Sequence, residues 1–265
     1  MAIILSSSAT VPRKGNREDL PPQAIVKFGS TSTTLLVAQR LDQPLLRRQQ
    51  LVNLYAADGP AQALKVAEEL RQAADDAGTV PLAAGGEALR DNPGLESRLR
   101  QLYPNWWHLT AETEGRLAWI AVKARHPSCD VVVDIGGGST EFISQRQVAS
   151  VPQGAARSAR HAIRWPALSA FERPVVIGGT AVALKWWTGR PRVGLGDVEA
   201  MQQALMDHPE QFQAWDPLRR SILPVGLSLL GDVFHTAGWD SVEVSERGLT
   251  EGLWLAASLG RGDRP

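Results

Sequence analysis

The segment VVVDIGGGSTEFI, at residues 131–143, contains residue types that could bind phosphate. Three successive glycines follow an apolar, β-branched run that is typical of a buried strand. Glycines let neighbouring backbone N–H groups converge on one point, and such a concavity binds phosphate oxygens. A hydroxyl donor comes next, so the expected phosphate loop consists of Gly136, Gly137, Gly138 and Ser139.

Acidic residues flank this loop on both sides. Asp134, at the end of the first strand, could hold a hydrated divalent cation that bridges phosphates, because hard cations prefer oxygen ligands. Glu141 points to the same side of the next strand as Ser139, since strand side chains alternate with a period of two. The alternative is an ordinary glycine-rich hairpin turn with a solvated aspartate.

A second copy of this pattern stands near the start of the chain. The segment AIVKFGSTSTTLLVA, at residues 24–38, aligns Lys27 with Asp134 and Gly29 with Gly136, at an offset of 107 residues (134 minus 27). Each copy is an apolar run, a turn of small residues and a second strand, which is the pattern of a β-hairpin. The spacing indicates two duplicated halves.

The segments around the hairpins alternate between helix and strand patterns. Apolar residues recur at helical spacing at 60–78, 92–104, 112–123, 180–187 and 219–236, and in the second part of the segment 241–258. Short apolar runs typical of strands lie at 80–86, at 173–179 and early in 241–258. Ser245 is a candidate N-cap of the last helix. We expect the helix at 112–123 to turn Leu117, Trp119 and Ile120 inward. This alternation predicts an α/β fold.

The composition excludes some classes of function. The chain has 28 basic and 28 acidic residues, and this balance argues against a nucleic-acid-binding protein or a polybasic membrane-binding one. The single cysteine, Cys129, excludes a disulfide framework and a Cys-rich metal site. No uncharged window is long enough for a membrane span, and residues 6–22 are polar and rich in proline. We therefore expect a cytoplasmic protein with a loose leader.

The segment DIGGGSTEF resembles the second phosphate loop of the exopolyphosphatase and guanosine pentaphosphate phosphatase (Ppx/GppA) family, in the actin and sugar-kinase superfamily. The segments EALRD at 87–91 and TAETEGRLAWIAV at 110–122 are similar to two other parts of that family. So are VVIGGTAVAL, DPLRRSILPVGLSLL and VSERGLTEGL. The resemblance runs from about Ala24 to Leu255.

The resemblance implies two actin-like (ribonuclease H-like) α/β domains that face each other across a cleft. We expect a leader at 1–22, a first domain at 23–126, a second domain at 127–260 and a tail at 261–265. The first domain would hold the first phosphate loop and Glu114, and the second domain would hold the DIGGGST loop. A homodimer is a candidate assembly.

The resemblance also assigns roles to single residues. Glu114 matches the carboxylate that orients or deprotonates the attacking water, and Arg90 matches a phosphate-contacting arginine. Asp134 and Glu141 match the acids associated with Mg²⁺, which is the expected cofactor. The first loop adds three expected phosphate-binding residues, which are Lys27, Gly29 and Ser30.

The first loop departs from the family's pattern D-x-G-S-N-S, because Lys27 stands in the place of the aspartate and Thr31 in that of the asparagine. An ammonium cannot coordinate magnesium and would repel it, but it can bind phosphate as a point charge. Alternatively, Lys27 turns outward as an ordinary strand lysine.

The expected function is an acid anhydride hydrolase that releases the terminal phosphate of inorganic polyphosphate or guanosine pentaphosphate. The alternative is a degenerate member that binds polyphosphate or an alarmone without efficient turnover. A sugar kinase is a third hypothesis, for which we find no sugar-binding segment. The ligand would be polyphosphate or a guanosine phosphate, and neither nucleic acid nor a membrane is an expected partner.

Two weaker candidates remain open. The pairs Trp106–Trp107 and Trp186–Trp187 could stack a base, or they could be packing residues. Arg157 and Arg160 could meet a polyanion, or they could lie on an exposed basic helix face.

Overall fold

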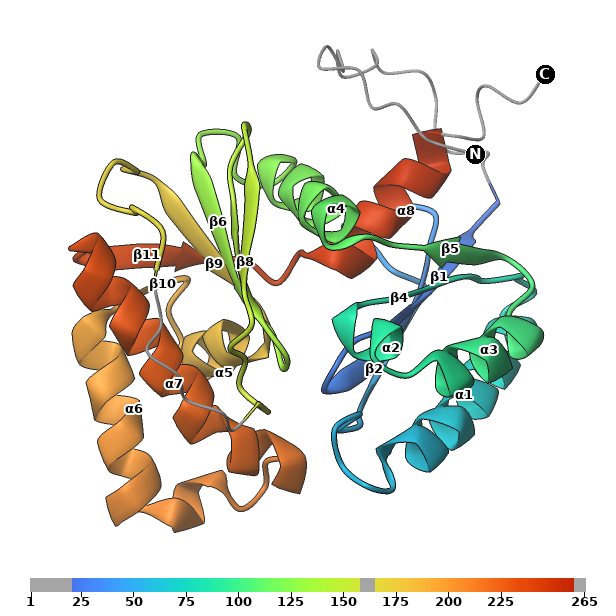
Figure 1. The fold of residues 1–265 in the computed structure, drawn as a ribbon, viewed down its shortest axis with the longest axis horizontal. Helices are drawn as coiled ribbons and strands as arrows, with labels where there is room; N and C mark the ends of the chain where they lie inside the picture. The colour runs from blue at the N-terminus through green and yellow to red at the C-terminus, as the bar shows by residue number, and fades with distance from the viewer. Residues whose placement is uncertain (1–20, 158–164, 260–265) are drawn as a thin grey trace.

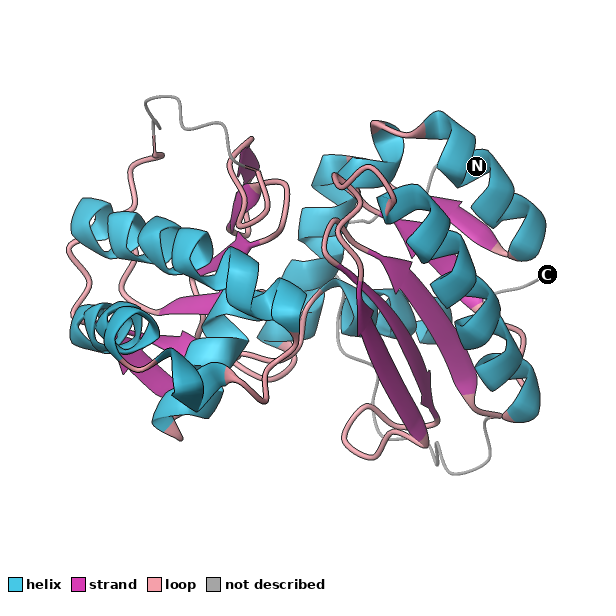
Figure 2. Ribbon diagram, turned by 90° about the horizontal axis from the view of Figure 1, so that it is seen from below, coloured by secondary structure: helices cyan, strands magenta, loops and turns pink. Residues whose placement is uncertain are grey.

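The computed structural model describes residues 21–157 and 165–259 of the 265-residue chain. It contains two sheets, each with helices on its faces, in two lobes that lie side by side (Figures 1 and 2). The expected tail, the leader up to residue 20 and Arg160 lie outside the described residues. None of the described helices is both long and apolar enough to cross a membrane.

The first sheet has five strands in the order β3-β2-β1-β4-β5. Strands β1 (Gln23–Phe28), β2 (Ser32–Ala38) and β3 (Leu46–Leu51) are antiparallel neighbours, whereas β4 (Leu82–Gly85) and β5 (Trp106–His108) continue the sheet in parallel. Alternate side chains of β1 therefore face opposite layers. Val26 and Phe28 pack with α1 (Gly59–Asp76) and α3 (Pro93–Leu102), whereas Ile25 packs with α4 (Ala111–Lys123) and α8 (Leu249–Leu259).

The second sheet has six strands in the order β10-β11-β9-β6-β7-β8. These strands are β6 (Val131–Ile135), β7 (Thr140–Ile143), β8 (Val148–Val151), β9 (Pro174–Ile177), β10 (Arg192–Gly194) and β11 (Ser241–Val244). One face packs with the helices α5 (Gly179–Thr188), α6 (Leu195–Asp207) and α7 (Pro217–Ala237) and with a 3₁₀ turn at Pro209–Phe212. The other face packs against α4, so this helix lies between the two sheets (Figure 1).

The two halves repeat the same architecture, as the sequence predicts. In both sheets an antiparallel hairpin and a third strand are followed by a strand that pairs parallel with the first, so β1, β2, β3 and β4 correspond to β6, β7, β8 and β9. The two hairpin loops are also closed by the same hydrogen bond. The Gly29 amide donates to the Ser32 carbonyl at 2.8 Å, and the Gly136 amide donates to the Ser139 carbonyl at 3.0 Å.

The structure differs from the expectations at three places. Helix α8 begins at Leu249, and Ser245 instead accepts a hydrogen bond from the Arg247 amide at 3.1 Å in the preceding turn, so it is not the N-cap. Helix α4 buries Leu117, Ala118, Ala121 and Val122 and leaves Trp119 and Ile120 partly exposed, because it must face two sheets. Helix α8, which falls within the expected second domain, packs on β1 and α4 of the first.

Candidate active site

A cleft of about 340 Å³ lies between the two lobes. Both hairpin loops, the first turn of α4 and the start of α5 line it. All the residues that the sequence suggested for the site line this cleft, namely Lys27, Gly29, Ser30, Arg90, Glu114, Asp134, Gly136, Gly137, Gly138, Ser139 and Glu141. The duplicated hairpins thus bring the two loops onto opposite walls of one cavity.

Each hairpin loop offers backbone N–H groups to the cleft. Within the described part of the chain, the amides of Ser30 and Thr31 in the first loop donate to no acceptor, and neither do those of Gly137 and Gly138 in the second. Backbone amides of this kind, gathered in a turn, bind anions such as phosphate. Both loops therefore have the donors that phosphate binding requires.

The tips of the two loops meet each other. A Cβ added to Gly137 would lie 3.0 Å from the Thr31 hydroxyl, and one added to Gly138 would collide with the Tyr55 hydroxyl. The absence of side chains at these two glycines is thus what allows the lobes to approach so closely.

Arg157 joins the lobes beside this contact. Its guanidinium binds Glu87 Oε1 at 3.1 Å and Asp91 Oδ2 at 3.5 Å, and it lies over the Tyr55 ring with 5.6 Å to the ring centre. The basic helix face considered for Arg157 is therefore wrong, because this side chain is part of an ion-pair network between the lobes. Sequence reasoning also missed Tyr55, for which no motif gave a signal.

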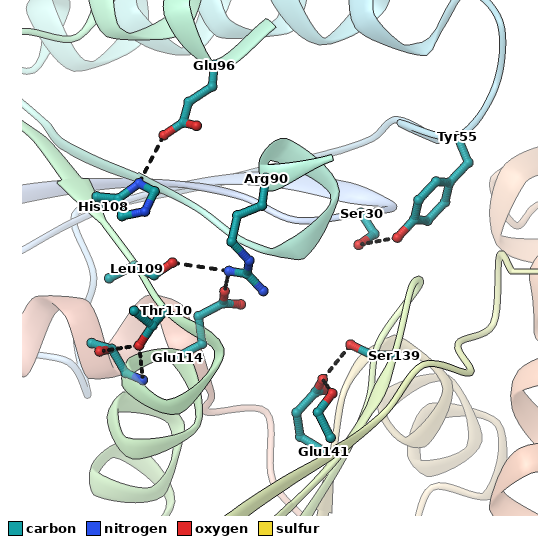
Figure 3. Close-up of polar contacts among 12 residues, drawn as sticks. Ser30, Tyr55, Arg90, Glu96, His108, Leu109, Thr110, Glu114, Ser139 and Glu141 are labelled. Atoms are coloured by element: carbon teal, nitrogen blue, oxygen red, sulfur yellow. Dashed lines mark hydrogen bonds and ion pairs between the residues drawn. The ribbon is translucent and has the colours of Figure 1, made fainter. Parts of the chain in front are cut away.

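An acidic wall follows the second loop. Asp134 on β6 lies directly opposite Glu141 on β7 in the hairpin register. Glu141 accepts hydrogen bonds from the hydroxyls of Ser139 and Ser150, the latter at 2.9 Å (Figure 3). Burial raises the pKa of Asp134, and burial together with the nearby Asp134 raises the pKa of Glu141 to about 8.

Glu114 stands in the first turn of α4, which begins at the N-cap Thr110. The Thr110 hydroxyl accepts from the Thr113 amide at 3.1 Å and fixes this turn. Arg90 donates from Nη1 both to Glu114 Oε1 and to the Leu109 carbonyl, the latter at 3.1 Å (Figure 3). Burial raises the pKa of Glu114, although the guanidinium of Arg90 acts in the opposite direction.

Lys27 turns into the cleft, so the alternative of an outward-facing strand lysine is wrong. It lines the cavity, and its Nζ lies only 2.5 Å from the place where a Cβ of Gly29 would stand. Burial lowers the pKa of Lys27, while the carboxyl groups of Asp134, Glu114 and Glu251 act to raise it. Its ammonium therefore lies over the first loop and is exposed to the charge of the acidic wall.

The tryptophan pairs divide between packing and exposure. Trp106 stacks on Phe28 with ring centres 5.9 Å apart, and Trp187 packs against the second core. Trp186 is 62% exposed and lines the cleft. Only Trp186 of these four thus combines a free aromatic face with a place in the site.

The residues present do not fit the expected magnesium ion. No cluster of three or more His, Cys, Asp or Glu side chains suited to a metal occurs at 21–157 or 165–259. Asp134 and Glu141 are two adjacent carboxyl groups, and the charge that faces them from the first loop is the ammonium of Lys27. A cation placed between them would be repelled by this charge.

Solved structures support the fold that the sequence predicts. An exopolyphosphatase from Cytophaga hutchinsonii is 17% identical, with a TM-score of 0.75 over 90% of this chain and 98% of that one. The Aquifex aeolicus member of the Ppx/GppA family is 20% identical, with a TM-score of 0.70 over 92% of this chain and 99% of that one. No protein-family model and no curated protein matches the chain. The two actin-like α/β domains expected from the sequence are confirmed.

Proposed function

We propose that the chain is a phosphohydrolase that releases the terminal phosphate of inorganic polyphosphate or guanosine pentaphosphate. The observation that carries this proposal is the pair of loops with free amides on opposite walls of one cleft, with Glu114 beside them. Similar solved structures are described as an exopolyphosphatase and a Ppx/GppA family member, which favours this substrate class.

The chemistry requires one water molecule and no covalent intermediate. The water oxygen bonds to the terminal phosphorus, the bond from phosphorus to the bridging oxygen breaks, and Glu114 accepts a proton from the water. Positioned donors stabilise the charge on the phosphoryl oxygens as it develops. A carboxyl group whose pKa is raised by burial is better suited to accept this proton near neutral pH than a solvated one.

A chain that binds such ligands without efficient turnover is the second candidate. The replacement of an acid by Lys27 in the first loop favours it, because phosphate binding needs only the cation and the amides. Phosphate release from polyphosphate and from guanosine pentaphosphate, measured side by side with ligand binding, separates the two. Release supports the hydrolase, binding without release supports the binder, and phosphate transfer from ATP to a sugar would point to a kinase.

A further inference from the structure

We infer that the Lys27 ammonium takes the place of a divalent metal ion in this cleft, so that phosphate is bound without one. This inference rests on the proposed function for the identity of the ligand. It is carried by the internal symmetry of the chain and by the position of one side-chain nitrogen.

The two hairpins place different chemistry at equivalent positions. In the first hairpin Lys27 is paired across the strands with Thr34, and in the second Asp134 is paired with Glu141. Both pairs are related by the same offset of 107 residues, and all four side chains line the cleft. An ammonium and a hydroxyl on one wall thus face two carboxyl groups on the other.

The ammonium is placed where a phosphoryl group would meet the first loop. Its nitrogen lies over Gly29, and the free amides of Ser30 and Thr31 follow Gly29 directly in the chain. Among the described residues, no carboxylate lies within ion-pair distance (4.0 Å) of Lys27, and it forms no hydrogen bond to another side chain. A partly buried ammonium without a partner has all three donors available for phosphate oxygens.

The neighbouring charges are consistent with a built-in cation. The carboxyl groups of Asp134, Glu114 and Glu251 and the guanidinium of Arg47 act on Lys27, and Arg47 is itself paired with Glu251. Lys27 is thus the positive charge on the first loop that faces the acidic wall. A lysine carries one charge where magnesium carries two, but it belongs to the chain and needs no ligand exchange.

The test measures binding of tripolyphosphate to the full chain, with magnesium or with a chelator, at constant ionic strength. Wild-type affinity in the chelator should be at least as high as with magnesium, because the cation is part of the chain and magnesium only competes for the free polyphosphate anion. Lys27→Met should weaken binding about tenfold or more, since it removes a charged donor while the length of the side chain is kept, and magnesium should not restore it. Lys65→Met, at an exposed position on α1, is the matched control and should bind as wild type.

The reverse substitution rebuilds the second wall on the first. The double variant Lys27→Asp with Thr34→Glu copies Asp134 and Glu141, and its tripolyphosphate binding should become dependent on magnesium. Wild-type binding that falls about tenfold in the chelator would overturn the inference, and so would unchanged binding by a folded Lys27→Met variant. The wild-type comparison is decisive even where a variant unfolds. These results concern binding, so the absence of phosphate release from any substrate would refute the proposed hydrolase and leave the inference intact.

Discussion

The guanidinium of Arg90 is bound to the carboxylate of Glu114, so two residues with separate expected roles form one unit. Arg90 is also fixed by the Leu109 carbonyl just before α4, and Glu114 lies against Gly86 at the end of β4. The ion pair therefore connects the short helical segment after β4, at Glu87–Arg90, to the helix that lies between the two sheets. It holds the carboxylate in place while leaving one oxygen without this partner.

Arg90→Gln should lower the free energy of unfolding by about 1–3 kcal/mol near pH 8, because it leaves a half-buried carboxylate without its charged partner. The loss should be smaller near pH 5. Removal of Arg90 raises the folded-state pKa of Glu114 further, and the stability associated with such a raised pKa is lost as the pH rises above the unfolded value. Urea unfolding at the two pH values measures this. Arg192→Gln, which removes an exposed pair with Glu243, is the control, and equal losses for Arg90→Gln at both pH values would contradict the account.

Glu141→Gln should change how stability depends on pH. The pKa of Glu141 is raised from 4.5 to about 8, so the wild type loses stability as the pH rises between these values. A glutamine is neutral throughout and can still accept from the hydroxyls of Ser139 and Ser150. The variant should match the wild type in Tm near pH 5 and exceed it near pH 9 in the presence of a chelator. Glu112→Gln, on the exposed side of α4, should have the wild-type Tm at both pH values. If the difference in Tm between Glu141→Gln and the wild type is the same near pH 5 and near pH 9, the raised pKa of Glu141 is refuted.

Gly138→Ala should weaken tripolyphosphate binding, because its Cβ would collide with the Tyr55 hydroxyl and push the loops apart. Adding Tyr55→Phe removes that hydroxyl and should partly restore binding. Gly94→Ala, in α3 with open space around the new Cβ, should leave binding unchanged and stabilise the chain by about 0.5–1 kcal/mol. Calorimetric titration measures tripolyphosphate binding by all three variants. Wild-type binding by Gly138→Ala would show that the loops need not meet.

Trp186→Ala distinguishes the two proposed substrates. If the exposed ring in the cleft stacks on a nucleobase, the variant should lose about tenfold in affinity for guanosine pentaphosphate and nothing for polyphosphate. Competition binding with both ligands measures this. An equal effect on the two ligands would show that Trp186 does not recognise a base.

The repeat in the sequence was sufficient to predict both hairpins and their loops, whereas the cleft between them was expected from the family resemblance. It works because a glycine-rich turn between two apolar runs is a local signal, and because the offset between Lys27 and Asp134 recurs between Thr34 and Glu141. Strand β3 and helix α6 were not predicted. Strand β3 reads LRRQQL and has no buried residue, so it has no clear apolar alternation.

Contacts between segments that are far apart in the chain could not be predicted from the sequence either. Helix α8 follows the last strand of the second sheet but packs on the first, and no local pattern records that return. The network of Arg157 with Tyr55 and Glu87 joins residues 70 to 102 positions apart in the chain. Such contacts depend on how the two lobes meet, which a pattern within one segment does not encode.

The most direct test of the central claim is phosphate release from polyphosphate by the wild type and by Glu114→Gln, measured together with substrate binding. We predict that the wild type releases phosphate, and that the variant binds as well but has a kcat lower by about 10²–10⁴, because it keeps the shape of the side chain and loses the base. A variant that hydrolyses at the wild-type rate, or a wild type that releases no phosphate from either proposed substrate, would contradict the account.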